Sequence, residues 1–217
     1  MKFITTIIVS LCMITLIGCG NTTTESESNP SIENNELVNA QEEESTLEQI
    51  ELSDSIQVAI DIAEYGTITL ELDGITAPIT VENFVNLASN GFYDGLTFHR
   101  IITGFMMQGG CPLGIGTGGS DTTIKGEFSS NGVENSISHV RGSVSMARLQ
   151  LADSASSQFF IVHEDSTFLD GDYATFGHVI SGMEIVDTIC ENTYVEDNNG
   201  TVKVENQPII TTIRILE

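Results

Sequence analysis

From residue 57 onward, alternating apolar and polar positions predict β-strands. Residues 57–63 and 67–72 alternate on either side of a turn at residues 64–66, which predicts a hairpin. Residues 209–216 alternate in the same way and predict a closing strand. Shorter apolar runs predict further strands at residues 96–102, 142–147 and 157–162.

Two segments carry a helical pattern instead. Pro78 suits the first turn of a helix over residues 80–90, in which Phe84 and Leu87 share one face and which Gly91 ends. A second, shorter helix is predicted at residues 182–190. Many short strands with only two helices predict a mainly β fold, a closed antiparallel barrel.

The first 18 residues have a different pattern. Lys2 is their only charge, and residues 3–17 are mostly apolar. Such a stretch is too short for a spanning helix and is typical of a signal peptide. The sequence LIGC at residues 16–19 resembles the bacterial lipobox, which implies that Cys19 receives a lipid and becomes the mature N-terminus. An ordinary secretory peptide with an incidental cysteine, or an uncleaved anchor, is the alternative.

Residues 19–52 are predicted to be a disordered acidic linker behind the lipidated cysteine. Residues 20–52 contain nine Glu and neither Lys nor Arg, so they cannot bury enough apolar surface to offset the entropy of ordering. We therefore expect a tether that holds a folded domain, residues 53–217, away from the membrane.

Composition excludes several functions for that domain. The chain has 217 residues, 40% of them hydrophobic, and a net charge of −24. This charge argues against binding nucleic acid or attaching electrostatically to anionic lipid.

The histidines of the chain lack a metal-ligand spacing, and residues 116–119 lack the lysine of a phosphate loop. Cys111 and Cys190 are either free thiols, which we favour, or a disulfide.

One arginine stands in an unusually apolar run. The sequence FHRIITGFMMQGG at residues 98–110 places Arg100 and Gln108 among large apolar side chains and a turn glycine, Gly104. A guanidinium cannot lose its proton, so burying it demands hydrogen-bond partners. Arg100 is therefore either a functional group or a buried member of a structural ion pair, and its apolar neighbours are either a binding surface or plain core.

Two later runs make the functional interpretation more specific: SASSQFFI at residues 154–161 and FLDGDYATFGH at residues 168–178. In this order, the three runs resemble the cyclophilin family of peptidyl-prolyl cis/trans isomerases, from about Val58 to the C-terminus. The resemblance implies a closed eight-stranded antiparallel barrel capped by two helices. It also implies an enzyme that needs no cofactor or metal and acts, as a monomer, on proline-containing polypeptide chains.

The resemblance assigns roles to individual residues. Arg100 and Gln108 are expected to be catalytic. The expected substrate-binding residues are Phe105, Met106, Ala147, Arg148, Gln158, Phe160, Phe168, Leu169 and Tyr173. Tyr173 replaces the histidine that the family usually has, and Phe168 replaces a tryptophan found in many members.

These patterns together predict a lipid-anchored, extracytoplasmic prolyl isomerase that assists the folding of exported proteins. A binding module or holdase that uses the same groove without relevant turnover is the first alternative. An acidic adhesin or structural lipoprotein is the second, although it would not require Arg100 and Gln108.

The lipid anchor can be tested directly. Because Cys19 ends a short apolar segment, Cys19→Ser should abolish incorporation of a labelled fatty acid. The matched control is Cys12→Ser, which should leave labelling intact because Cys12 departs with the signal peptide. Labelled Cys19→Ser protein would disprove the lipoprotein interpretation.

Overall fold

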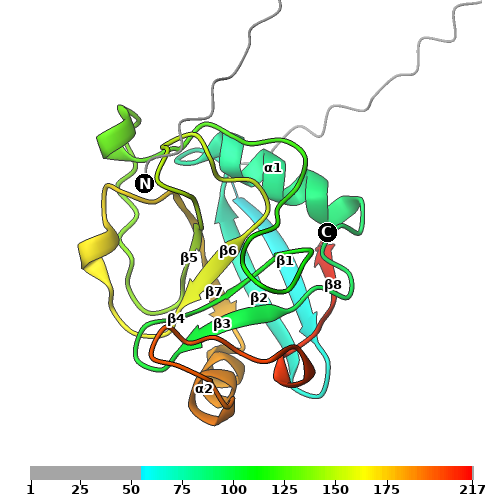
Figure 1. Cartoon of the computed structure of the whole chain (residues 1–217). Helices are drawn as coiled ribbons and strands as arrows, with labels where there is room; N and C mark the ends of the chain where they lie inside the picture. The colour runs from blue at the N-terminus through cyan, green and yellow to red at the C-terminus, as the bar shows by residue number, and fades with distance from the viewer. Residues whose placement is uncertain (1–54, 217) are drawn as a thin grey trace, which may run out of the picture. The chain divides into compact units, whose positions relative to one another are not determined.

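The computed structural model describes residues 55–216, which form one antiparallel sheet of eight strands and two α-helices (Figure 1). The strands are β1 (Ser55–Ile62), β2 (Gly66–Asp73), β3 (Phe98–Ile102), β4 (Met106–Gly109), β5 (Ser143–Met146), β6 (Phe159–Val162), β7 (Thr175–Ser181) and β8 (Ile210–Ile215). The helices are α1 (Pro78–Ser89) and α2 (Met183–Asn192), with short 3₁₀ turns at Ser129–Asn131, Thr167–Leu169 and Val204–Asn206. The predicted signal peptide, Cys19 and acidic linker lie outside the described residues.

The strands are ordered β3-β4-β6-β5-β7-β2-β1-β8, and each neighbouring pair is antiparallel. The mainly β architecture with eight antiparallel strands and two helices is therefore confirmed. Full closure is not: between the edge strands β3 and β8 of this region there is one isolated bridge, Thr97 to Ile209. Backbone hydrogen bonds from Phe98 to Pro208 at 3.0 Å and from Ile210 to Leu96 at 2.8 Å also join these edges.

The apolar residues whose alternation predicted the first hairpin lie in the core. In β2, Ile68, Leu70 and Leu72 are fully buried, and the β1 register sets Ile60 opposite Ile68 and Val58 opposite Leu70. Since side chains alternate between the faces of a strand, one face of the hairpin enters the main core. Figure 1 shows α1 and α2 at opposite ends of the sheet. Neither helix of residues 55–216 has the length and apolar character needed to cross a bilayer.

Two strands were missed. The Met106–Gly109 segment carries no alternation because Met106 and Met107 are both buried, Met106 in a small satellite cluster and Met107 in the main core. Strand β7 begins within the third motif, which was interpreted as chemistry rather than as secondary structure. Side chains buried on both faces of a strand remove the period-two signal on which a prediction depends.

Helix α1 is capped by a side chain far away in sequence. Pro78 occupies its first turn, and Ala77 at the N-cap offers no side-chain acceptor. The buried carboxylate of Glu127 accepts hydrogen bonds from the N–H groups of Ile79 at 3.1 Å and Thr80 at 2.8 Å, and from the Thr80 hydroxyl at 2.7 Å. A negative charge at a helix N-terminus also suits the helix dipole.

Glu127→Gln should therefore destabilise the fold, because a neutral amide replaces one accepting oxygen and leaves a buried donor unpaired. The expected loss is about 1–3 kcal/mol in the free energy of unfolding, measured by urea denaturation. Glu134→Gln, an exposed change in the same connection, is the control and should change stability little. Equal stabilities of the two variants would show that the cap contributes nothing.

Candidate active site

The hairpin of β3 and β4 places an arginine opposite a glutamine. In its antiparallel register, Arg100 pairs with Gln108 and Ile102 with Met106. Gly104 turns the chain between them at φ +77°, in the left-handed region where a side chain would be strained. Across the hairpin, Arg100 Nη1 donates a hydrogen bond to Gln108 Oε1 at 3.3 Å. A segment of nine residues therefore contains both members of this pair.

The half-buried guanidinium of Arg100 is also held from a second direction. Its Nε donates to the backbone carbonyl of Asn199 at 2.9 Å, and its Cζ lies 6.0 Å from the centre of the Phe105 ring. Burial lowers the pKa of Arg100, while the nearby Tyr173 and Asp197 oppose this effect. An arginine so placed stays charged at neutral pH, because the unperturbed pKa of a guanidinium lies far above neutrality.

Beside this guanidinium is an apolar pocket of about 180 Å³. It is lined by Arg100, Phe105, Met106, Gln108, Ala147, Arg148, Phe160, Leu169 and Tyr173. Met106, Phe160 and Val162 form a small buried cluster, separate from the main core, against which other wall residues pack. The pocket therefore combines apolar walls with the guanidinium of Arg100, which hydrogen bonds hold in place.

A buried histidine supports the floor of the apolar pocket. The His139 ring stacks on Phe160 with 6.0 Å between centroids and 14° between planes. Its Nδ1 lies 2.8 Å from Asp170 Oδ1, and its Nε2 lies 3.1 Å from the Ser145 hydroxyl. Burial lowers the pKa of His139, although Asp170 acts in the opposite direction. Phe160 thus rests on a ring fixed by hydrogen bonds at both nitrogens.

The guanidinium of Arg148 contacts two aromatic rings. It lies 4.9 Å from the centre of the Phe128 ring and 4.8 Å from that of Tyr173. It donates to the carbonyls of Asp172 at 2.8 Å and Leu149 at 2.9 Å. Arg148 and Tyr173 both line the apolar pocket, and the contact between them holds the Tyr173 ring in place.

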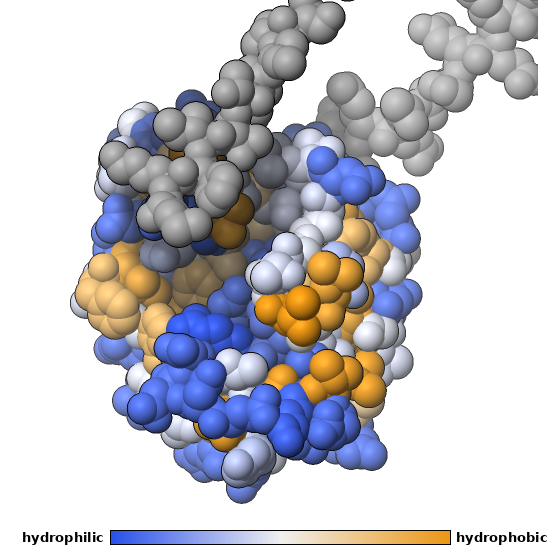
Figure 2. Space-filling view, viewed as in Figure 1, coloured by the Kyte–Doolittle hydropathy of each residue, from blue (hydrophilic) through white to orange (hydrophobic). Residues whose placement is uncertain are grey.

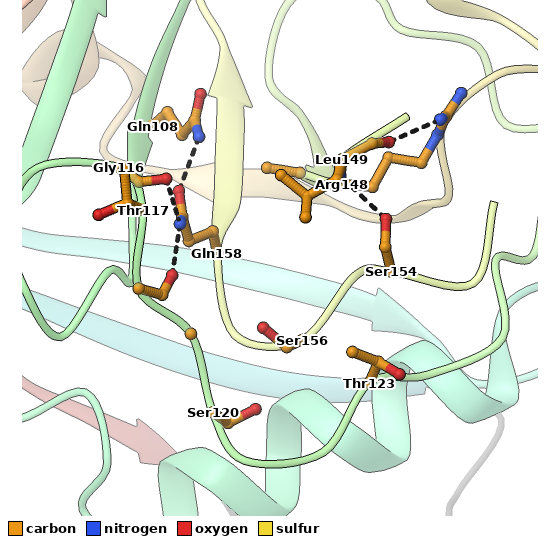
Figure 3. Close-up of a pocket in the computed structure, with 13 residues that line it drawn as sticks. Gln108, Gly116, Thr117, Ser120, Thr123, Arg148, Leu149, Ser154, Ser156 and Gln158 are labelled. Atoms are coloured by element: carbon orange, nitrogen blue, oxygen red, sulfur yellow. Dashed lines mark hydrogen bonds between the residues drawn. The ribbon is translucent and has the colours of Figure 1, made fainter. Parts of the chain in front are cut away.

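A second cavity of about 250 Å³ adjoins the first, and we call it the glycine-loop pocket (Figure 3). It is lined by Gln108, Gly116, Thr117, Gly118, Gly119, Ser120, Thr123, Ala147, Arg148, Leu149, Ser154, Ser156 and Gln158. Figure 3 shows Gln108 and Gln158 directed toward each other, and Gln108 Nε2 donates to Gln158 Oε1 at 2.9 Å. Gln158 Nε2 then donates to the carbonyls of Gly116 at 3.0 Å and Gly118 at 2.6 Å. One chain of hydrogen bonds therefore joins the arginine to the glycine loop.

The structure brings together the residues that the sequence singled out, with two differences. All of the predicted catalytic and substrate-binding residues line the apolar pocket except Gln158, which lines the glycine-loop pocket, and Phe168. Phe168 is 72% exposed, and its ring packs 5.6 Å from that of Phe105 on the outer side. On the face in Figure 2, hydrophobic residues form separate patches among hydrophilic ones.

Sequence reasoning missed Asn199 and gave His139 no role in the site. Asn199 contributes a backbone carbonyl, which leaves no trace in side-chain identity, and His139 acts through contacts with residues distant in sequence. Cys111 and Cys190 are buried free thiols, as favoured. Within residues 55–216, no three His, Cys, Asp or Glu side chains are grouped as metal ligands would be.

Comparison with known proteins gives one consistent result. The sequence model of a family described as cyclophilin type peptidyl-prolyl cis-trans isomerase matches residues 57–215. Peptidyl-prolyl cis-trans isomerase B of Bacillus subtilis is 52% identical over 117 residues, which cover 54% of this chain and 78% of that protein. A peptidyl-prolyl cis-trans isomerase of Helicobacter pylori is 46% identical over 133 residues, 60% of this chain and 79% of that protein. A Cryptosporidium parvum cyclophilin crystallised in the presence of the dipeptide Ala-Pro superposes with a TM-score of 0.66 at 31% identity, covering 74% of this chain and 99% of that one.

The contact between Arg148 and Tyr173 generates a prediction about peptide binding. Arg148→Ala removes the cation beside Tyr173, a contact worth about 0.5–2 kcal/mol, and should raise the Kd of a proline-containing peptide several-fold in NMR titrations. Arg148→Lys should restore only part of the affinity, because an ammonium lacks the planar fork that reaches two carbonyls. Arg214→Ala, an exposed change on β8, is the matched control. Unchanged affinity in Arg148→Ala would show that Tyr173 needs no such support.

Proposed function

The chain belongs to the family of cyclophilin-type peptidyl-prolyl cis-trans isomerases, and we propose that it turns over X-Pro bonds through a hydrogen bond from Arg100 to the twisted prolyl amide. The observation that carries this proposal is the fixed guanidinium in the wall of an apolar pocket of about 180 Å³. The mechanism requires neither a nucleophile nor a cofactor.

The chemical demand is specific. Amide resonance sets a barrier of about 18–20 kcal/mol to rotation. In the twisted state the prolyl nitrogen becomes pyramidal and gains a lone pair, so a donor aimed at that nitrogen stabilises the transition state more than the planar ground state. A preorganised cation at the edge of an apolar cup meets this demand, because an electrostatic interaction is stronger where water is excluded.

The surroundings of Arg100 support this role. Asn199 and Gln108 each accept one of its five N–H groups, which fixes the plane of the guanidinium and leaves other donors for a substrate. Phe105, Met106, Phe160 and Leu169 are the apolar walls against which a prolyl ring would pack. The glycine-loop pocket would receive the residue that precedes the X-Pro pair, since it shares Gln108 and Ala147 with the apolar pocket.

The proposed place of action is outside the cytoplasm, at a membrane to which Cys19 is attached by lipid. The support is the apolar segment before Cys19 and the acidic stretch after it, all of which lie outside the described residues. The clients would then be exported polypeptides that contain proline. A holdase that binds the same chains without turnover is the alternative, and a protease-coupled isomerisation assay separates the two.

The arginine is tested by two substitutions. Arg100→Ala should lower kcat/KM by about 10²–10³, or roughly 2.7–4 kcal/mol, because a donor to the transition state is lost. Arg100→Lys should also be poor, because an ammonium lacks the planar fork that Asn199 and Gln108 hold. In both variants peptide affinity should change less than turnover, since the apolar walls remain.

Phe160→Ala is the matched control, because it opens the apolar pocket and should weaken peptide binding and turnover together. Circular dichroism would establish that each variant is folded. A folded Arg100→Ala protein with near wild-type turnover would show that Arg100 is structural and that this mechanism is wrong.

A further inference from the structure

The turn between β3 and β4 is tied to the rest of the protein by a histidine. Gly104 at this turn donates its N–H to Nδ1 of His163 at 2.9 Å. The backbone N–H of His163 donates to the carbonyl of Phe105 at 2.8 Å. His163 follows β6 and is 4% exposed. One buried residue thus holds two consecutive residues of the turn.

The ion pair of Asp187 with Arg141 lies on the other side of the His163 ring. Its Nε2 lies 3.3 Å from Oδ1 of Asp187 on α2. Arg141 holds that carboxylate with Nη1 at 2.8 Å and Nη2 at 2.8 Å from its two oxygens, and also donates to the His163 carbonyl at 2.9 Å. Hydrogen bonds from Arg141 lower the pKa of Asp187, so the carboxylate is charged at neutral pH.

These contacts select one tautomer. Because Gly104 donates to Nδ1, that nitrogen must be unprotonated, and the proton of the neutral ring must lie on Nε2. Asp187 faces Nε2 and favours the same arrangement. A second link joins the turn to the same helix, since the Thr103 hydroxyl donates to the Cys190 carbonyl at 2.6 Å.

The turn matters for the reaction because of what it carries. Phe105 is a wall of the apolar pocket, and the Arg100 guanidinium lies 6.0 Å from its ring centre. Arg100 and Gln108 stand on the two strands that the turn connects. A turn that moved would therefore shift both the cup and the cation relative to a bound proline.

We propose that His163 is a positioning residue for isomerisation: its Nδ1, oriented by Asp187 and Arg141, anchors the Gly104 turn and so holds Phe105 and Arg100 in place. The residue touches no substrate and acts through the hairpin. This inference rests on the proposed function of the apolar pocket, but it concerns a contact outside that pocket.

The test compares two substitutions of similar size. His163→Leu removes the acceptor and should lower kcat/KM about tenfold, because the Gly104 N–H loses its partner. His163→Asn places an amide oxygen near the position of Nδ1 and should restore kcat/KM to within about twofold of wild type. The exchange rate of the Gly104 amide, measured by NMR, should rise in His163→Leu and stay near wild type in His163→Asn.

A variant on α2 keeps the proposal testable if His163→Leu does not fold. Asp187→Asn can donate an amide N–H to Nε2, which favours a proton on Nδ1 that faces the Gly104 donor. Its kcat/KM should fall several-fold, whereas Glu191→Gln, an exposed change on the same helix, should not alter it.

Each outcome decides the question. Wild-type activity in Asp187→Asn, or equal activity of His163→Leu and His163→Asn, would overturn the positioning role. Turnover by the wild-type protein is measured first, because its absence would refute the proposed function instead. In that case the Gly104 exchange rates still report whether His163 anchors the turn.

Discussion

The site depends on keeping one guanidinium half-buried without losing its charge. Arg100 cannot deprotonate, so the fold must supply acceptors where it also supplies an apolar cup. Gln108 does so from the adjacent strand and Asn199 from a loop about a hundred residues later. Both are neutral acceptors, which satisfy the donors without neutralising the cation. In the proposed mechanism, a carboxylate in their place would form an ion pair with Arg100 and weaken its stabilisation of the developing lone pair.

The need for an acceptor at Arg100 also links the two pockets, because Gln108 lines both of them. Gln108 uses its oxygen for Arg100 and its amide for Gln158, which in turn holds the carbonyls of Gly116 and Gly118. The side-chain amides are thereby oriented by their partners at both ends. A shift of the glycine loop would consequently move Gln158 and Gln108 and change the position of Arg100. The two parts of a bound peptide would then be coupled through Gln108.

The sequence predictions succeeded for elements that are formed by residues close together along the chain. The strands of the first hairpin and both helices arise from residues close along the chain, and all were predicted from the sequence pattern, whereas the roles of Arg100 and Gln108 were implied by the family resemblance. Strand β4 escaped because Met106 and Met107 are buried on opposite faces. The Glu127 cap, the Asn199 carbonyl and the His163–Asp187 contact join residues 47, 99 and 24 positions apart, respectively, and no local pattern encodes such pairings. Arg148 was expected at the substrate edge and does line both pockets, but local sequence does not encode the contacts of its guanidinium with the rings of Phe128 and Tyr173.

The net charge of the chain and the charge at the site are opposite in sign. The chain is strongly acidic, with a net charge of −24, whereas the proposed mechanism relies on a single cation. At the site, however, the carboxylate that acts on Arg100 is that of the exposed Asp197, which solvent screens. Apolar walls flank the guanidinium, and Asn199 and Gln108 hold it as neutral acceptors that leave its charge in place. The acidity of the protein therefore influences what it meets in solution, while the buried geometry determines what it can catalyse.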